Sequence, residues 1–262
     1  MAEDKIRFED GAGYEKMMGT WSRIAGEVFL DWLAPPPGLR WVDVGCGNGA
    51  FTELLVGRCA AADVQGVDPS EAQLAFARTR PAARVAQFQL GDAMALPFDN
   101  GGFDAAVMAL VLFFVPEPAK GVAEMVRVVR PGGLVAAYAW DILGGGFPQA
   151  ALQEEMRAMG VEPAYPPSVD ASRIDAMRGL WTDAGLEAVQ TRQITVERTF
   201  ENFEEVWAIN LLGTGTGPKI KAMTPADRDL LRQRLQARLQ PDASGRITYS
   251  ARANAVKGRT PG

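Results

Sequence analysis

Short apolar runs alternate along the first half of the chain with segments whose apolar residues recur at helical spacing. The apolar runs predict five strands, at residues 39–44, 64–68, 85–90, 103–110 and 134–140. The segments between them predict helices at residues 50–58, 70–79 and 120–129. The run at 103–110 is typical of a parallel strand that is buried on both faces. Together the pattern predicts βαβ units with right-handed connections and a doubly wound α/β sheet.

The ends of the chain follow a looser pattern. Residues 13–33 have helical spacing and end at Ala34-Pro35-Pro36-Pro37-Gly38, where proline blocks the helix. After residue 141, helices are expected at 148–159, 173–184, 203–212 and from Thr224, strands at 186–200 and 246–256, and a loop at 213–218. We expect one domain over 1–262, with an N-terminal helical cap (1–38), a ligand-binding core (39–141), cap or lid insertions (142–172 and 201–223), and the rest of the sheet and its helices (173–200 and 224–262).

The composition narrows the possible chemistry. The chain has 262 residues, of which 47% are hydrophobic, enough for a large core in one domain. It contains no histidine, which excludes Ser/His and Cys/His nucleophile pairs and most zinc chemistry. Only Cys46 and Cys59 occur, without metal-binding spacing, so we expect neither a disulfide framework nor a metal site.

The charge is acidic overall but unevenly distributed. A formal net charge of −5 disfavours nucleic acid as a partner. From Lys219 onward, however, there are ten Lys and Arg residues and three Asp and Glu residues. A solvated helix face is the favoured interpretation, and attraction of an acidic substrate or surface is the alternative. No apolar leader begins the chain, and the longest apolar run, 105–115, is too short to span a bilayer, so we expect a cytoplasmic protein without membrane insertion.

A glycine-rich turn, Gly45-Cys46-Gly47-Asn48-Gly49, lies between the first predicted strand and the helix after it. Such a turn puts bare backbone and a helix N-terminus at the carboxyl edge of the sheet, where nucleotide-type ligands bind. Gly45-x-Gly47-x-x-Ala50 also satisfies the dinucleotide fingerprint, with Asp68 placed to bind the ribose of NAD. A NAD-dependent oxidoreductase is therefore one hypothesis, although no acid–base pair for hydride chemistry is found near the fourth or fifth strand.

Three features favour S-adenosylmethionine (SAM) over NAD. Asp43 places a carboxylate two residues before Gly45, which is awkward for a pyrophosphate but suits the cationic amino group of a methionine moiety. Asp92, which follows the third strand, can accept a hydrogen bond from the exocyclic amine of adenine. The turn itself is Gly-x-Gly-x-Gly, which is tighter than the dinucleotide form needs.

Together these segments resemble the motifs of class I SAM-dependent methyltransferases, in particular the ubiquinone/menaquinone-biosynthesis-like (methyltransferase type 11) family of small-molecule enzymes. The matching segments are Val42–Gly49, Gly66–Ser70, Gly91–Phe98 with Phe103-Asp104, and Arg130–Gly133. They occur in the family's order and cover roughly residues 40–140. The resemblance implies a Rossmann-like, doubly wound α/β fold with a mainly parallel seven-stranded sheet, an antiparallel last strand and a small helical cap.

The resemblance also implies which residues bind the cofactor. The methionine part of the cofactor would contact Asp43, Gly45, Cys46 and Gly47. The ribose would contact Asp68, and the adenine would contact Pro69, Asp92, Ala93 and Met94. Leu110 would lie near the sulfonium. In many such enzymes a tyrosine of an N-terminal helix closes over the methionine end, and Tyr14 is the candidate here. Where many relatives carry histidine after the fourth strand, this chain has Phe113 and Phe114, so a polar role is lost there.

The implied reaction is methyl transfer from SAM to a small-molecule acceptor, with S-adenosylhomocysteine as the product. Alignment alone can supply about 7–11 kcal/mol in such a transfer, so the absence of histidine does not exclude it. A thiol, an amine, an activated carbon or an acidic phenol suits a site without an imidazole base, and no catalytic base is identified.

Aromatic residues in or beside the expected roof segments predict an acceptor pocket for an apolar or planar molecule. These residues are Tyr14, Trp21, Phe113, Phe114, Trp140, Phe147, Tyr165 and Trp207. A non-catalytic SAM-binding module and a nucleic-acid or protein methyltransferase are the alternatives, and the sequence does not indicate an oligomeric state.

Overall fold

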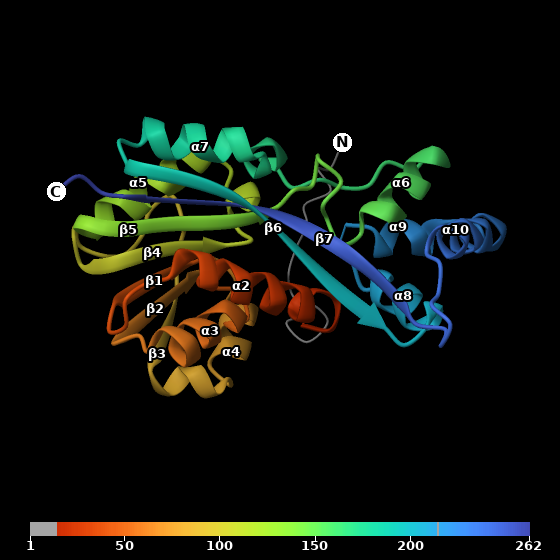
Figure 1. Ribbon diagram of the computed structural model, residues 1–262, viewed down its shortest axis with the longest axis horizontal. Helices are drawn as coiled ribbons and strands as arrows, with labels where there is room; N and C mark the ends of the chain where they lie inside the picture. Colours follow the sequence, from red (N-terminus) through yellow and green to blue (C-terminus); the bar gives the residue numbers. More distant parts are fainter. Residues whose placement is uncertain (1–14, 214) are drawn as a thin grey trace.

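The computed structural model describes residues 15–213 and 215–262, and a seven-stranded sheet runs through the larger part of the molecule (Figure 1). The strands lie in the order β3-β2-β1-β4-β5-β7-β6. Their bounds are β1 Arg40–Val44, β2 Asp63–Asp68, β3 Ala86–Leu90, β4 Phe103–Ala109, β5 Val129–Trp140, β6 Glu187–Phe200 and β7 Ile247–Arg259. The first five strands pair in parallel, and β7 is antiparallel to both β5 and β6. The predicted fold class is therefore confirmed.

The strand order reverses between β1 and β4. The chain moves outward from β1 to β2 and β3, and then returns to place β4 on the other side of β1. In open α/β sheets, ligands bind in the crevice at the carboxyl ends of the strands where this reversal occurs. The end of β1, at Val44, opens directly into the glycine turn, so the topology puts that turn at the expected crevice.

Helices cover both faces of the sheet (Figure 1). One face carries α2 Thr20–Leu33, α3 Ala50–Cys59 and α4 Glu71–Ala77, and the other carries α5 Pro118–Val128 and α7 Ile174–Asp183. In α5 the buried residues Val122, Met125 and Val128 recur every third position, which forms the apolar stripe that packs on the sheet. Ser70 caps α4 by accepting a hydrogen bond from the Gln73 backbone N–H, as its spacing predicts.

A second group of helices forms a cap beyond one end of the sheet (Figure 1). It consists of α6 Ala150–Ala158, α8 Phe203–Asn210, α9 Gly217–Ala222 and α10 Pro225–Arg238. Within the cap, α10 lies against α6. Arg234 of α10 pairs with Glu155 of α6 at 2.6 Å, and Leu231 and Leu235 of α10 are buried.

The last two strands form a long ribbon that joins the sheet to the cap. Residues Ile247–Arg252 of β7 pair only with β6, because β5 meets β7 from Ala253 onward. This part of the ribbon extends past the sheet towards α8 and runs alongside α2 (Figure 1). The cap and the N-terminal helix are thereby held near the same end of the sheet.

Two of the differences from the predicted element boundaries have a clear physical reason. The fifth strand begins at Val129 rather than Leu134, because Val129 pairs with Phe103 before the register shifts, and residues 130–133 form an irregularity within the strand. The predicted loop at 213–218 ends in a helix that is not predicted, α9. Its start at Gly217 is compatible with Pro218, since a proline needs no hydrogen-bond partner in a first helical turn.

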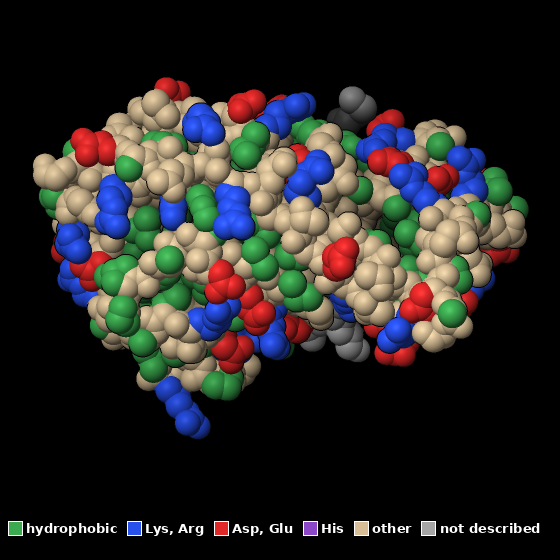
Figure 2. Space-filling model, viewed as in Figure 1, with side chains coloured by type: hydrophobic (Ala, Val, Ile, Leu, Met, Phe, Trp, Pro, Cys, Tyr) green, Lys and Arg blue, Asp and Glu red, His purple; other side chains and the backbone are tan. Residues whose placement is uncertain are grey.

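The core is apolar and the surface is mixed in charge. Trp21, Trp41, Tyr138 and Trp181 are among the largest fully buried side chains. Figure 2 shows Lys and Arg interspersed with Asp and Glu over the viewed face. Among the residues that the structure describes, no helix is long and apolar enough to cross a membrane.

Candidate cofactor and acceptor site

The glycine turn after β1 requires glycine for two physical reasons. Gly45, Gly47 and Gly49 all have positive φ, at 75°, 51° and 79°. A Cβ atom at Gly45 would lie 2.5 Å from a methyl carbon of Val111, whereas a Cβ atom at Gly47 would meet nothing closer than 4.0 Å. Gly45 therefore permits a close approach of the chain after β4, and Gly47 leaves bare backbone with open space beside it.

Asp68 ties the end of β2 to this turn. Its Oδ2 accepts a hydrogen bond from the Gly47 backbone N–H at 2.9 Å, and its Oδ1 accepts one from the Ser70 N–H at 2.9 Å. Burial raises the pKa of this carboxyl, and these two N–H groups oppose the rise. A carboxylate can accept about four hydrogen bonds, so Asp68 retains capacity for a ligand hydroxyl.

Asp43 lies beneath the turn and is completely buried. Its Oδ2 accepts a hydrogen bond from the Thr52 hydroxyl at 2.6 Å, while its Oδ1 has no hydrogen-bond partner. Burial raises the pKa of this carboxyl to about 7, against the opposing effect of the Thr52 hydrogen bond. Burial also raises the pKa of the Cys46 thiol, so Cys46 is not a thiolate nucleophile.

The loop after β3 stands next to the end of β2. The Gly91 backbone N–H donates to the Asp68 carbonyl oxygen at 3.2 Å, which brings the two loops together. Asp92 is exposed, and its Oδ1 accepts a hydrogen bond from the Met94 N–H at 2.8 Å. The capping of this small turn by Asp92 leaves its second oxygen for a ligand. Ala93 and Met94 are half-buried in the same loop, and Pro69 is exposed after β2.

Leu110 ends β4 in a conformation that non-glycine residues rarely adopt, with φ of 63°. Its backbone N–H donates to the Tyr138 carbonyl oxygen at 2.8 Å, which holds the strained residue in place. The next residue, Val111, is the one that packs on Gly45. Backbone strain of this kind is often retained at functional sites. Here the conformation of Leu110 directs the chain that follows β4 away from the glycine turn and towards a pocket.

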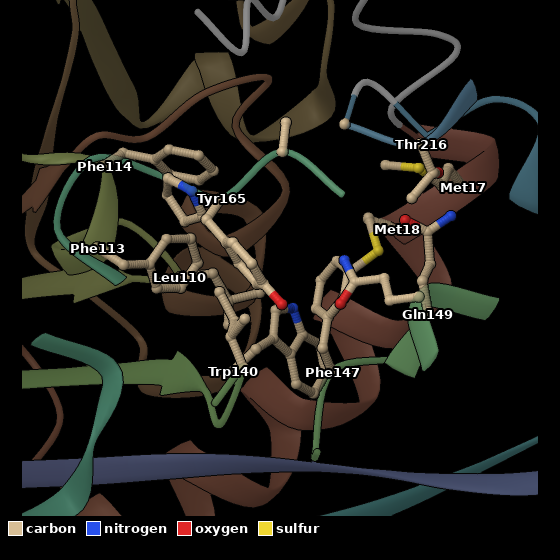
Figure 3. Close-up of a pocket in the computed structure, with 15 residues that line it drawn as sticks. Met17, Met18, Leu110, Phe113, Phe114, Trp140, Phe147, Gln149, Tyr165 and Thr216 are labelled. Atoms are coloured by element: carbon tan, nitrogen blue, oxygen red, sulfur yellow. The ribbon is translucent and has the colours of Figure 1, made fainter. Parts of the chain in front are cut away.

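That pocket lies between the carboxyl edge of the sheet and the cap (Figure 3). Its space, including the open mouth, is about 610 Å³. The lining is mostly apolar and comes from the N-terminal segment, the ends of β4 and β5, and the cap. The lining residues are Met17, Met18, Leu110, Phe113, Phe114, Trp140, Ile142, Phe147, Gln149, Gln153, Ala164, Tyr165, Pro166, Gly215 and Thr216.

The predicted aromatic residues divide into those that line the pocket and those that do not. Phe113, Phe114, Trp140, Phe147 and Tyr165 line it, as predicted (Figure 3). The prediction is wrong for two others: Trp21 is 1% exposed within the core, and Trp207 is not among the lining residues and stacks on Phe203. Tyr14 lies outside the described residues.

The N-terminal segment is joined to the glycine turn by a polar cluster that sequence reasoning missed, Glu15, Asn48, Glu53 and Arg80. Asn48 in the turn donates to Glu15 at 2.8 Å. Arg80 donates to Glu15 at 2.6 Å, to Glu53 at 2.9 Å and to the Asn48 carbonyl oxygen at 2.7 Å. The residues are far apart in sequence, and only Asn48, by its place inside the turn, carried a signal.

A second polar group was also missed, at the cap wall of the pocket. Gln149 donates to the Asn210 side-chain oxygen at 3.1 Å, and Thr216 donates to the Asn210 carbonyl oxygen at 3.5 Å. Gln149, Gln153 and Thr216 are buried, although residues of these types are mostly exposed. In the described part of the chain, no group of three or more His, Cys, Asp or Glu side chains could hold a metal ion.

Comparison with known proteins finds a similar domain over the part of the chain that contains the glycine turn. Residues 42–137 match the family model described as a methyltransferase domain, and this stretch contains the glycine turn, Asp68, Asp92 and Leu110. The matched stretch, and the seven-stranded sheet with its antiparallel last strand, are both similar to those of class I SAM-dependent methyltransferases.

A curated relative is the ubiquinone/menaquinone biosynthesis C-methyltransferase UbiE of Roseobacter denitrificans, 32% identical over 136 residues. The alignment covers 50% of this chain and 53% of that protein, so the chain spans about half the length of the curated relatives it matches.

Solved structures share the fold at low sequence identity. The YcgJ protein of Bacillus subtilis has a TM-score of 0.61 at 17% identity, over 91% of this chain and 98% of that one. Phosphoethanolamine N-methyltransferase 2 of Haemonchus contortus, in complex with SAM, has a TM-score of 0.60 at 17% identity, over 96% of this chain and 57% of that one.

Proposed function

We propose that this protein transfers a methyl group from SAM to a small apolar or planar acceptor. The observation that carries the proposal is the shared edge of the sheet, where Val111 packs on the glycine turn and its neighbour Leu110 lines the apolar pocket. A cofactor on the turn and an acceptor in the pocket would therefore be adjacent. The family match over residues 42–137 supports methyl transfer as the chemistry of this edge.

The residues around the turn suit SAM. The open side of Gly47 gives room for a ligand against bare backbone, and the buried Asp43 has an unpartnered oxygen beneath it. A carboxylate there favours a cationic amino group over a pyrophosphate. We assign the methionine part to Asp43, Gly45, Cys46 and Gly47, the ribose to Asp68, the adenine to Pro69, Asp92, Ala93 and Met94, and the sulfonium region to Leu110. Tyr14 stays a proposal for the closing residue.

Bound SAM would supply an activated methyl group on its sulfonium. In an in-line displacement, its bond from sulfur to the methyl carbon would break as the bond to the acceptor formed, which would leave S-adenosylhomocysteine as a neutral thioether. The chain contributes by holding the acceptor in line and excluding water, through side chains such as Phe113, Phe114 and Phe147. No imidazole is available, so the acceptor gives its proton to water at the mouth of the pocket or arrives without it.

The nature of the acceptor follows from the pocket walls. Aromatic side chains along the walls of an apolar pocket suit a planar ring. The curated relative named for C-methylation in ubiquinone and menaquinone biosynthesis supports a planar acceptor as well. The pocket belongs to the chain's interior and not to a charged surface, which supports a small molecule rather than a nucleic acid.

Calorimetric titration with S-adenosylhomocysteine tests the cofactor assignment, with NAD as a parallel ligand. We expect micromolar binding of S-adenosylhomocysteine, no binding of NAD, and at least about tenfold weaker binding in Asp68→Ala, because the ribose loses a charged hydrogen-bond acceptor. Asp68→Asn keeps one side-chain oxygen that can accept a hydrogen bond from the backbone of the glycine turn. It therefore separates the effect of the lost charge from the effect of a disrupted turn.

Asp63→Ala is the matched control, since Asp63 begins the same strand at the opposite edge of the sheet. It should bind S-adenosylhomocysteine as the unaltered protein does. Binding of NAD in place of S-adenosylhomocysteine, or equal binding by Asp68→Ala, would refute the cofactor assignment.

A further inference from the structure

Trp140, at the end of β5, has an indole N–H that is buried without a hydrogen-bond partner. The side chain is 2% exposed, so water does not replace the missing partner. Trp140 lines the pocket, and in Figure 3 its indole points into the space bounded by Leu110, Phe147 and Tyr165. A buried hydrogen-bond donor without a partner destabilises a folded protein and is uncommon. Its presence at a pocket wall therefore indicates that an atom of a bound ligand accepts this hydrogen bond.

Other tryptophans show that the fold does not impose this arrangement. The indole N–H of Trp181 donates to the Val135 carbonyl oxygen at 2.9 Å, although that side chain is equally buried. Trp41 in β1 also has an unpartnered indole N–H, but it lies in the core and lines neither of the two pockets described. Among the described residues, Trp140 is therefore the tryptophan whose unpartnered donor meets a pocket.

The hydroxyl group of Tyr165 is a second hydrogen-bond donor in the pocket wall. The Tyr165 hydroxyl oxygen accepts a hydrogen bond from Arg157, so its O–H is oriented to donate elsewhere. Tyr165 and Trp140 both line the pocket, and most of its other lining residues are apolar. Two donors in an apolar, aromatic pocket complement a planar ligand that carries an oxygen acceptor.

We infer that the Trp140 indole N–H binds an oxygen atom of the acceptor molecule, a phenolic or carbonyl oxygen on a planar ring. The inference rests on the proposed function, because it takes this pocket as the acceptor site. The hydrogen bond fixes the ring relative to Leu110, and so decides which ring atom faces the cofactor. Trp140 is a specificity-determining residue in this scheme, and an unsubstituted aromatic ring is rejected because it leaves the donor unpaired.

Binding of two matched probes, 2-naphthol and naphthalene, tests the inference by calorimetry on protein saturated with S-adenosylhomocysteine. The unaltered protein should bind 2-naphthol about fivefold to tenfold more tightly than naphthalene, since one hydrogen bond separates the probes. Trp140→Phe should lose this preference and keep its affinity for naphthalene. Trp41→Phe, the same substitution at a core tryptophan, should retain the preference.

The ratio of two affinities within one protein is insensitive to a general loss of stability. Equal or absent binding of the probes by the unaltered protein, or a preference that persists in Trp140→Phe, overturns the inference. Repeating the titration without S-adenosylhomocysteine separates this result from the cofactor assignment. A protein that discriminates the probes but does not bind S-adenosylhomocysteine would support the Trp140 site and refute the methyltransferase proposal.

Discussion

Asp43 lies in β1, just before the glycine turn, and its carboxyl group is completely buried. Its place two residues before Gly45 is read from the sequence, and the structure puts it beneath the turn. What the sequence does not reveal is that the carboxyl is sealed from water, with one oxygen on Thr52 and the other unpartnered. The burial cost makes this residue a source of pH-dependent stability.

The raised pKa of Asp43, from 3.8 to about 7, predicts that the free energy of unfolding falls as pH rises from about 4 to about 7. In this window the folded protein holds a proton that the unfolded chain releases, so the stabilisation is complete below about pH 4 and lost through about pH 7. Asp43→Asn should lack this loss, which could reach about 4 kcal/mol. Urea denaturation at about pH 4.5 and about pH 7.5 measures the difference.

Asp183→Asn, at an exposed carboxylate that ends α7, is the control and should follow the unaltered protein at both pH values. If Asp43→Asn and the unaltered protein lose stability equally between the two pH values, Asp43 is not the titrating group.

At the scale of elements, the important event is the docking of the N-terminal segment on the glycine turn. Glu15 of the helical turn Glu15–Gly19 meets Asn48 and Arg80, and Arg80 is only 13% exposed. An arginine with this degree of burial and three partners contributes more than a surface ion pair does. The cluster therefore holds the segment that begins at Glu15 against the glycine turn, where we propose that the methionine end of the cofactor binds.

Arg80→Met should release this segment. We expect faster amide hydrogen exchange in residues 15–33, a loss of stability of about 1–3 kcal/mol from the lost hydrogen bonds of the Arg80 guanidinium, and weaker binding of S-adenosylhomocysteine. Hydrogen exchange measured by mass spectrometry, together with calorimetry, checks the three effects.

Arg58→Met is the comparison, because Arg58 also joins α3 to α2, through Asp31, but both side chains are largely exposed. Its removal should cost less than about 1 kcal/mol and leave exchange in residues 15–33 nearly unchanged. Similar exchange in the two variants would show that the buried cluster does not hold the segment.

At the scale of the whole molecule, the basic C-terminal part of the chain is balanced by acidic helices of the cap. Arg232 pairs with Glu204 of α8, and Arg238 pairs with Glu154 of α6, beside the Arg234–Glu155 pair. The solvated, paired helix face is thus the better interpretation of the surplus of Lys and Arg. Red and blue side chains are intermixed at the cap end in Figure 2, in agreement with this balance.

This arrangement predicts no binding of duplex DNA by the unaltered protein. Fluorescence anisotropy of a labelled duplex at about 150 mM salt should not change, because paired arginines displace few counterions from phosphate. The triple variant E154Q/E155Q/E204Q frees these arginines and should gain weak, salt-sensitive binding. Micromolar binding by the unaltered protein would contradict the prediction and favour an acidic partner for this surface.

Sequence and structure agree where the determining interactions are local or periodic. Apolar runs and helical spacing predict the five core strands and their helices, because a residue's side of a strand or helix follows from its position in the repeat. The glycine turn is equally readable, since Gly45 and Gly49 need backbone angles that other residues avoid. The exceptions are segments in which the local residue preference disagrees with the structure. One is α9, which begins with a glycine and a proline that predict a loop.

Of the residues that line the pocket, the sequence predicted only the aromatic ones. Met17, Trp140 and Thr216 meet there although they belong to an N-terminal helix, the end of β5 and the cap. Contacts of this kind depend on how elements pack, which no repeat in the sequence specifies. By itself, then, the sequence determined the first five strands and the glycine turn, because these follow from periodicity and backbone conformation. The candidate cofactor residues came from the resemblance of its motifs to those of a known family, and they stay a proposal. Only the tertiary structure decided which side chains share the pocket and which buried polar groups remain without partners, because these follow from packing between distant segments.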